Sequence, residues 1–142
     1  MSKVAISKRH VFPMRVYYED TDAGGVVFYA NYLNFAERAR SELLRSIGTD
    51  NRKLKDQHGI LFAVSGCEVK YKKPARLDDM LEVHTVLTNV GAAKLTAAQT
   101  VKRDGEDLVL MDVDLACLNE AGRPARLPAL LREALMAASN CH

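Results

Sequence analysis

The chain has 142 residues, of which 48% are hydrophobic, and this is enough for one domain with a hydrophobic core. Its 20 basic and 18 acidic residues leave a net charge of +2, so the composition favours neither nucleic acid nor an anionic membrane as the main partner. The sequence has no long apolar run, and residues 1–13 contain no apolar signal-peptide core. We therefore expect one cytoplasmic domain over residues 1–142 with no membrane span, in which residues 1–12 form a flexible tail.

A strand is expected to begin at Arg15–Tyr18 and to end at the turn-forming segment 20–25. A long helix is expected from Tyr32, and Gly48 is its stop signal. Its apolar side chains recur at helical spacing and lie on one face, at Phe35, Ala36, Ala39, Leu43 and Ile47. The polar stretch 51–59 is expected to be a connection.

The second half of the chain has the alternation that is typical of strands. Asp104-Gly105 is a strong hairpin signal, which makes the sheet antiparallel at that point, and Gly66 predicts a bulge or bend. The predicted strands are Ile60–Tyr71, Met80–Val90, Lys94–Arg103 and Leu108–Leu118, followed by a terminal helix at Ala129–Ala138.

This order of elements predicts an α+β fold, in which the long helix packs on one side of a five-stranded antiparallel sheet. A single helix cannot cover such a sheet completely, so we expect the edges or the far face to be used in self-association.

The three cysteines are Cys67, Cys117 and Cys141, an odd number without C-x-x-C spacing. They are therefore expected to be reduced thiols, with Cys67 and Cys117 packed in the core. No group of His, Cys and acidic residues has the spacing of metal ligands, so no metal site is expected.

Between the first strand and the long helix, two carboxylates precede a glycine pair. This places Asp22 near a helix N-terminus, whose unpaired N–H groups can hold a developing oxyanion while a carboxylate attacks or activates water. The same pattern also occurs in ordinary turns and helix starts, so both interpretations stay open. Asp20, two residues earlier, is expected to have a structural role in the turn.

Two segments carry a family resemblance: Tyr17–Val27 (YYEDTDAGGVV), followed by Ala30-Asn31-Tyr32 and Glu37–Arg40, and Val69–Asp79 (VKYKKPARLDD). They closely resemble the hotdog-fold acyl-CoA thioesterases of the 4-hydroxybenzoyl-CoA thioesterase group, in the branch associated with the Tol-Pal cell-envelope system. The resemblance implies a long helix wrapped by a curved sheet, homodimers or homotetramers with sites at the subunit interface, and hydrolysis of an acyl-CoA to a free acid and CoA. CoA is then part of the substrate, and no cofactor is implied.

The resemblance also implies roles for single residues. Asp22 matches the catalytic acid, as nucleophile or as general base for water, and Tyr29 falls where a backbone N–H polarises the thioester carbonyl. Many members of this branch carry histidine where this chain has Tyr29, and a tyrosine still supplies the N–H. Glu37 is the alternative acid, because a second branch of hotdog thioesterases uses a glutamate on the central helix.

Lys72, Lys73 and Arg76 are candidates for binding the CoA phosphates, and a solvated charge run is the competing interpretation. An acyl-carrier-protein thioesterase is the first functional alternative, with these cations as the docking surface. A hotdog dehydratase would need a histidine that the motif lacks. A non-catalytic acyl-CoA-binding or envelope-associated interaction module is the alternative from another class.

Overall fold

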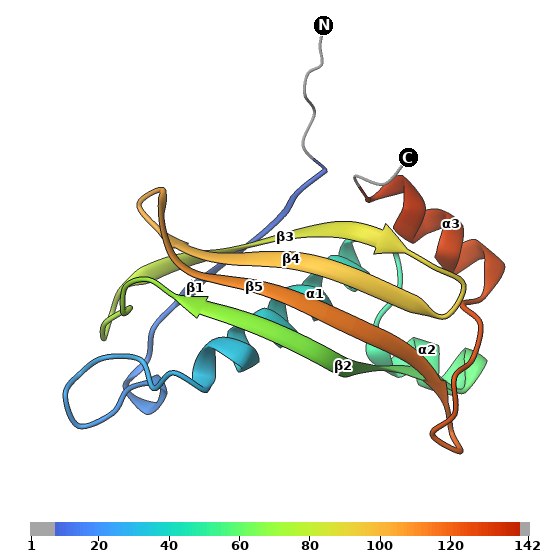
Figure 1. The fold of residues 1–142 in the computed structure, drawn as a ribbon, viewed down its shortest axis with the longest axis horizontal. Coiled ribbons are helices and arrows are strands. Elements are labelled where there is room, and N and C mark those ends of the chain that lie inside the picture. The colour runs from blue at the N-terminus through green and yellow to red at the C-terminus, as the bar shows by residue number, and fades with distance from the viewer. Residues whose placement is uncertain (1–7, 140–142) are drawn as a thin grey trace, which may run out of the picture.

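The computed structural model describes residues 8–139 of the chain, and Figure 1 shows its fold. In this part of the chain no helix is long and apolar enough to cross a membrane. The elements in chain order are β1 (His10–Arg15), a short 3-10 turn (Tyr18–Asp20), α1 (Asn31–Ser46), α2 (Asn51–His58), β2 (Ile60–Tyr71), β3 (Met80–Val90), β4 (Lys94–Arg103), β5 (Glu106–Asn119) and α3 (Ala129–Ala137).

The five strands form one antiparallel sheet in the order β1-β3-β4-β5-β2, and α1 lies across one face of it (Figure 1). The predicted α+β architecture and the hotdog arrangement of a central helix on a five-stranded sheet are therefore confirmed. The side chains of α1 that are buried against the sheet are Tyr32, Phe35, Ala36, Ala39, Leu43 and Leu44. They follow the helical spacing of the apolar residues in the sequence.

The hairpin between β4 and β5 is confirmed at Asp104-Gly105. Both residues have positive φ angles, 51° for Asp104 and 79° for Gly105, as a type I′ turn requires. β5 covers Glu106–Asn119 and is therefore longer at both ends than the predicted strand Leu108–Leu118. At its start, the strand resumes directly after the turn.

The first strand is not where the sequence pattern placed it. β1 covers His10–Arg15, so the expectation of a strand at Arg15–Tyr18 was wrong, as was that of a tail reaching residue 12. Pro13 lies inside β1, where it is tolerated because β1 is an edge strand and needs its N–H groups on one side only. Residues 1–7 of the expected tail lie outside the described part of the chain.

The stretch 51–59 is not a plain connection but contains α2. The Asp50 side chain caps this helix by accepting a hydrogen bond from the Lys53 N–H at 2.8 Å. Gly59 ends it in the left-handed conformation, with φ at 63°. Leu54 is its one buried residue, so the helix has almost no apolar periodicity to reveal it.

Strand β2 lies at the sheet edge, and α1 leaves much of its inner face uncovered. The register shifts between Val64 and Gly66, which confirms the predicted bulge. Val64 is 52% exposed although it pairs with the buried Leu115. Cys67 is exposed as well, so its predicted core packing was wrong; Cys117 on β5 is buried as expected, and Cys141 lies outside the described residues.

Candidate active site

Asp22 lies in a tight loop between β1 and α1. Its N–H donates to the Val26 carbonyl at 2.9 Å, and its carboxylate accepts a hydrogen bond from the Gly24 N–H at 2.8 Å. Gly25 has a φ of 77°, a conformation that favours glycine. Asp22 itself is exposed, so this loop presents an ionisable carboxylate at the surface of the single chain.

Asp20 holds the base of this loop, as expected for a structural residue. Its side chain is buried and accepts a hydrogen bond from the Tyr17 N–H at 2.9 Å. Its carbonyl accepts from the Phe28 N–H at 3.1 Å and from the Asn31 side chain at 2.9 Å. Since Asn31 is the first residue of α1, these contacts fix the loop against the start of the helix.

Tyr29 lies two residues before α1, and its side chain is 63% exposed. Among the hydrogen bonds between described residues, none uses its N–H as donor, whereas its carbonyl accepts from the Tyr71 hydroxyl at 3.2 Å. The N-cap residue Ala30 has no side-chain acceptor to offer. The N-terminus of α1 therefore keeps donors for an incoming acceptor, next to the positive end of the helix dipole.

The loop of Asp22 is bound to the segment after β2. The Val27 N–H donates to Ala75 at 2.9 Å, and the Leu77 N–H donates to Gly25 at 3.0 Å. The N–H of Ala75 in turn donates to the hydroxyl of Tyr32, at 2.9 Å. These bonds bring Asp22, Tyr29 and the predicted cationic segment to the same end of the molecule.

A hollow of about 230 Å³ lies beside Tyr29, and two of the three predicted cations line it, namely Lys72 and Lys73. Rings of Tyr29, Tyr32 and Tyr71 form its walls. The ammonium of Lys73 already pairs with Glu106. Arg76 does not line this hollow, although its backbone pairs with Val26 in the loop of Asp22.

An ion pair fixes the segment that follows these lysines. Arg103 on β4 donates to the Asp79 carboxylate at 2.7 Å, and the Arg76 N–H donates to the same carboxylate at 2.8 Å. Burial alone would raise the pKa of Asp79, but the two hydrogen bonds and the charge of Arg103 hold it below its ordinary value. Asp78 has a positive φ of 69° in this turn.

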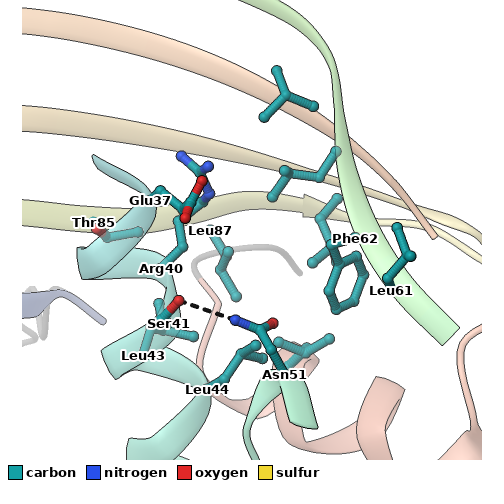
Figure 2. A pocket seen from close by; sticks show the side chains of 14 residues that line it. Glu37, Arg40, Ser41, Leu43, Leu44, Asn51, Leu61, Phe62, Thr85 and Leu87 are labelled. Atoms are coloured by element: carbon teal, nitrogen blue, oxygen red, sulfur yellow. Dashed lines mark hydrogen bonds between the residues drawn. The ribbon is translucent and has the colours of Figure 1, made fainter. Parts of the chain in front are cut away.

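Glu37 lies at a second and larger cavity, of about 320 Å³, which Asp22 does not line. This cavity is bounded by α1, α2, α3 and the inner face of the sheet, and Figure 2 shows Glu37 and Arg40 on α1 with Phe62 of β2 facing them. Ser41 of α1 accepts a hydrogen bond from the Asn51 side chain at 3.0 Å on the same side. Glu37 therefore lines a cavity, whereas Asp22 lines neither this cavity nor the hollow beside Tyr29.

A buried polar network borders this cavity, and the sequence pattern did not predict it. The Arg40 guanidinium donates to Gln99 at 2.9 Å, and the Gln99 amide donates to the Ala36 carbonyl at 3.0 Å and to the Thr85 hydroxyl at 2.9 Å. Gln99 and Thr85 are at most 1% exposed. Burial lowers the pKa of Arg40, and the charge of Glu37 acts against that shift.

Comparisons with known proteins agree with this structure. The family model described as "Thioesterase superfamily" matches residues 24–110. An acyl-CoA thioesterase, YbgC of Haemophilus influenzae, is 42% identical over 108 residues, which are 76% of this chain and 79% of that protein. The acyl-CoA thioester hydrolase YbgC of Escherichia coli O6:H1 is 47% identical over 90 residues, or 63% of this chain and 66% of that protein.

Among solved structures, a probable thioesterase from Bartonella henselae superposes with a TM-score of 0.81 at 38% sequence identity. The match covers 84% of this chain and 99% of that one. The family match spans more than half of the chain, and the relative from Haemophilus influenzae aligns with three quarters of it. The chain therefore belongs to the thioesterase superfamily and has its hotdog fold.

Proposed function

We propose that this protein is a thioester hydrolase that cleaves an acyl-CoA into a free carboxylic acid and CoA. One observation carries the assignment of the site: the loop of Asp22 is tied through Asp20 to the start of α1, and the Tyr29 N–H there has no acceptor in the described chain. The names of the two relatives support the class of substrate.

In the proposed reaction, the thioester carbonyl oxygen accepts a hydrogen bond from the Tyr29 N–H, which stabilises the negative charge that forms there. The Asp22 carboxylate either attacks the carbonyl carbon or removes a proton from the attacking water. The C–S bond then breaks, and the CoA thiolate leaves and takes up a proton. If Asp22 attacks, the one water molecule of the reaction enters after the thiolate has left: it hydrolyses the resulting anhydride and restores the carboxylate.

Lys72 and Lys73 are proposed to contact the CoA phosphates, because they share a hollow with Tyr29. Lys72 is the better candidate of the two, since Lys73 already pairs with Glu106. Arg76 would reach the phosphates only from outside this hollow.

Glu37 is the second candidate for the catalytic acid. The observation that favours it is its place at the larger cavity beside the guanidinium of Arg40. Asp22 and Glu37 can be separated by experiment because each can be neutralised without changing the shape of its side chain.

The test is thiol release from acyl-CoA thioesters by the wild type, Asp22→Asn and Glu37→Gln. Loss of a general base or nucleophile is expected to lower kcat by about 10²–10⁴ in Asp22→Asn, while Glu37→Gln keeps most of its activity. Glu19→Gln, an exposed carboxylate just before the loop, is the matched control. If kcat falls less than about tenfold in Asp22→Asn, Asp22 is not the catalytic acid. If kcat falls strongly in Glu37→Gln alone, Glu37 is the catalytic acid.

The other functions make different predictions for the same assay. An acyl-carrier-protein thioesterase turns over the same acyl group faster on the carrier protein than on CoA. A dehydratase forms an enoyl product from a 3-hydroxyacyl thioester, and a binding module binds acyl-CoA saturably without releasing thiol.

The protein is also proposed to work as a homodimer or homotetramer. The support is the partly uncovered inner face of the edge strand β2, where Val64 and Tyr71 are each about half exposed. Light scattering in solution tests this proposal, and a monomer at assay concentration contradicts it. The cytoplasmic location and the link to the Tol-Pal system stay predictions.

A further inference from the structure

Tyr71 is the last residue of β2, and its hydroxyl contacts the start of α1. It donates a hydrogen bond of 3.2 Å to the backbone carbonyl of Tyr29, which lies 42 residues earlier in the chain. Figure 1 shows the end of β2 at the same end of the molecule as the first turn of α1. In the described chain this hydroxyl is the one donor to the Tyr29 carbonyl. The bond therefore ties the junction between the Asp22 loop and α1 to the sheet.

The ring of Tyr71 is held between two other rings. It meets the ring of Tyr29 edge-on, with centroids 6.1 Å apart, and the ring of Tyr32 at 5.8 Å. All three rings line the hollow that Lys72 also lines. Burial raises the pKa of the Tyr71 phenol above its ordinary value of 10.0, and the neighbouring Tyr29 and Cys67 add to the shift. The hydroxyl is therefore protonated at neutral pH and can donate to the carbonyl.

Two consecutive peptide groups at this junction are each held by their carbonyl. The carbonyl of Phe28 accepts a hydrogen bond from the Asn31 N–H at 2.8 Å, and the carbonyl of Tyr29 accepts from Tyr71. The described chain has no cis peptide bond, and in a trans peptide the N–H points away from the carbonyl. The N–H groups of Tyr29 and Ala30 thus point away from these two contacts. Neither N–H has an acceptor among the described residues.

The two contacts depend on different parts of the chain. The contact at Phe28 closes a local turn, so residues of the same loop are enough to form it. The contact at Tyr29 depends on a side chain of β2. A hydrogen bond to a carbonyl also polarises its peptide group and strengthens the N–H of that group as a donor. Tyr71 therefore affects both the direction and the strength of the Ala30 N–H.

We propose that Tyr71 is a positioning residue for thioester hydrolysis: its hydroxyl holds the Tyr29 carbonyl, so that the N–H groups of Tyr29 and Ala30 are oriented in advance toward the negative oxygen of the transition state. The proposal rests on the proposed function and adds to it a residue of β2. Tyr71 does not contact the thioester carbonyl in this arrangement. It acts through the backbone that it holds.

The first experiment compares kcat and KM of the wild type, Tyr71→Phe and Tyr17→Phe on the acyl-CoA thioester that the wild type hydrolyses fastest. Phenylalanine keeps the ring in the wall of the hollow and removes the hydroxyl alone. A misdirected donor is expected to lower kcat about ten- to hundredfold and to leave KM within about twofold, because its bond to the oxygen is strongest in the transition state. Tyr17 is the matched control, since its side chain is 62% exposed and does not line the hollow, so Tyr17→Phe keeps the wild-type kcat.

The second experiment does not depend on turnover. Acetonyl-dethio-CoA, the ketone in which a methylene replaces the sulfur of acetyl-CoA, cannot be cleaved as a thioester. Hydrogen bonds to its carbonyl oxygen lower the C=O stretching frequency, which isotope-edited infrared spectra of the bound ketone measure. The frequency is expected to fall in the wild type and in Tyr17→Phe, and to fall less in Tyr71→Phe. A merely structural role of the hydroxyl leaves the frequency the same in all three proteins.

The proposed function and the proposed role of Tyr71 fail in different ways. An unchanged kcat in Tyr71→Phe, or a lower kcat with an unchanged C=O frequency, overturns the role of Tyr71 and leaves the thioesterase proposal standing. A lower kcat that comes with dissociation of the oligomer in light scattering does the same.

If the wild type hydrolyses no thioester, the thioesterase proposal fails and the infrared spectra decide on Tyr71. A C=O frequency that falls in the wild type and falls less in Tyr71→Phe then supports its role in orienting the N–H groups. Equal frequencies in the two proteins remove that role.

Discussion

The hydrogen-bond network of Gln99 should contribute measurably to stability, and Gln99→Leu tests this. Gln99 is almost fully buried on β4, and it joins α1 to β3 through the Ala36 carbonyl, the Thr85 hydroxyl and the Arg40 guanidinium. Leucine has a similar volume and no polar atoms. The substitution therefore leaves three groups without their partner while changing the packing little.

The expected loss follows from these three hydrogen bonds. The two bonds to neutral partners contribute about 1 kcal/mol each. The bond from Arg40 adds less than a buried charged bond would, because this guanidinium is partly exposed and water replaces the lost acceptor. The free energy of unfolding should thus fall by about 2–3 kcal/mol, and the Tm by about 8 °C for a chain of this length.

Urea denaturation of the wild type, Gln99→Leu, Thr85→Val and the double variant measures the effect. The m value should stay constant and the midpoint should fall. Removing both partners of one bond costs less than the two single losses together, so the double variant should be more stable than additivity predicts by about 1 kcal/mol. A loss below about 0.5 kcal/mol in Gln99→Leu, or additive single effects, would refute this account of the network.

Three further predictions concern the loop after β2 and the caps of α2. Asp79→Asn should lower the free energy of unfolding by about 1–2 kcal/mol at neutral pH, because Arg103 loses its carboxylate partner. The pKa of Asp79 is lower in the folded protein than its ordinary value of 3.8, so its ion pair stabilises the fold fully above pH 3.8. This stabilisation is lost as the pH falls through the folded pKa. Urea denaturation should therefore show the free energies of unfolding of the wild type and Asp79→Asn converging in acid. Asp50→Ala removes the N-cap of α2 and should cost about 1 kcal/mol, with Asp50→Asn as the capping control in thermal unfolding. Gly59→Ala should cost about 1 kcal/mol, because alanine is strained at a φ of 63°, and an unchanged Tm would contradict this reason.

The fold could be predicted from the sequence wherever an element repeats a pattern several times. β3 and β4 alternate over ten or eleven residues, and their predicted ends agree with the structure. α2 could not be predicted from periodicity because only Leu54 is buried in it. Its signals were the two caps, Asp50 and Gly59, which are local and weaker than a repeated apolar face. β1 lies earlier in the chain than predicted, and it contains Pro13, a residue that is rare in strands but is tolerated in an edge strand.

Side-chain burial on β2 shows a different limit. Alternation predicts which face of a strand a residue is on, and Cys67 does pair with the buried Val113 on the face toward α1. Whether that face is covered depends on where the helix crosses the sheet, and α1 leaves the inner face of β2 partly open. This is a property of the assembled fold, so a pattern within one strand does not contain it.

The candidate site also has one part that could be predicted from the sequence and one part that could not. The loop of Asp22 and the start of α1 are adjacent in sequence, so their proximity could be predicted from the order of carboxylate, glycine pair and helix. The network of Arg40, Gln99 and Thr85 joins three separate elements. Its one signal in the sequence was a polar Gln99 at a position where the alternation of β4 calls for an apolar residue.

The position of α1 has a consequence for synthesis of the protein on the ribosome. This helix precedes all but one strand in the chain, yet the side chains that cover it belong to strands that end at Asn119. While the chain is being made, Phe35, Ala39 and Leu43 emerge about 75 residues before β5 is complete, at a time when no sheet exists to bury them. The two local hairpins β3-β4 and β4-β5 can pair as soon as they emerge, whereas the pairing of β2 with β5 must close a long loop. The nascent chain thus presents an apolar helix to chaperones until its last strand arrives.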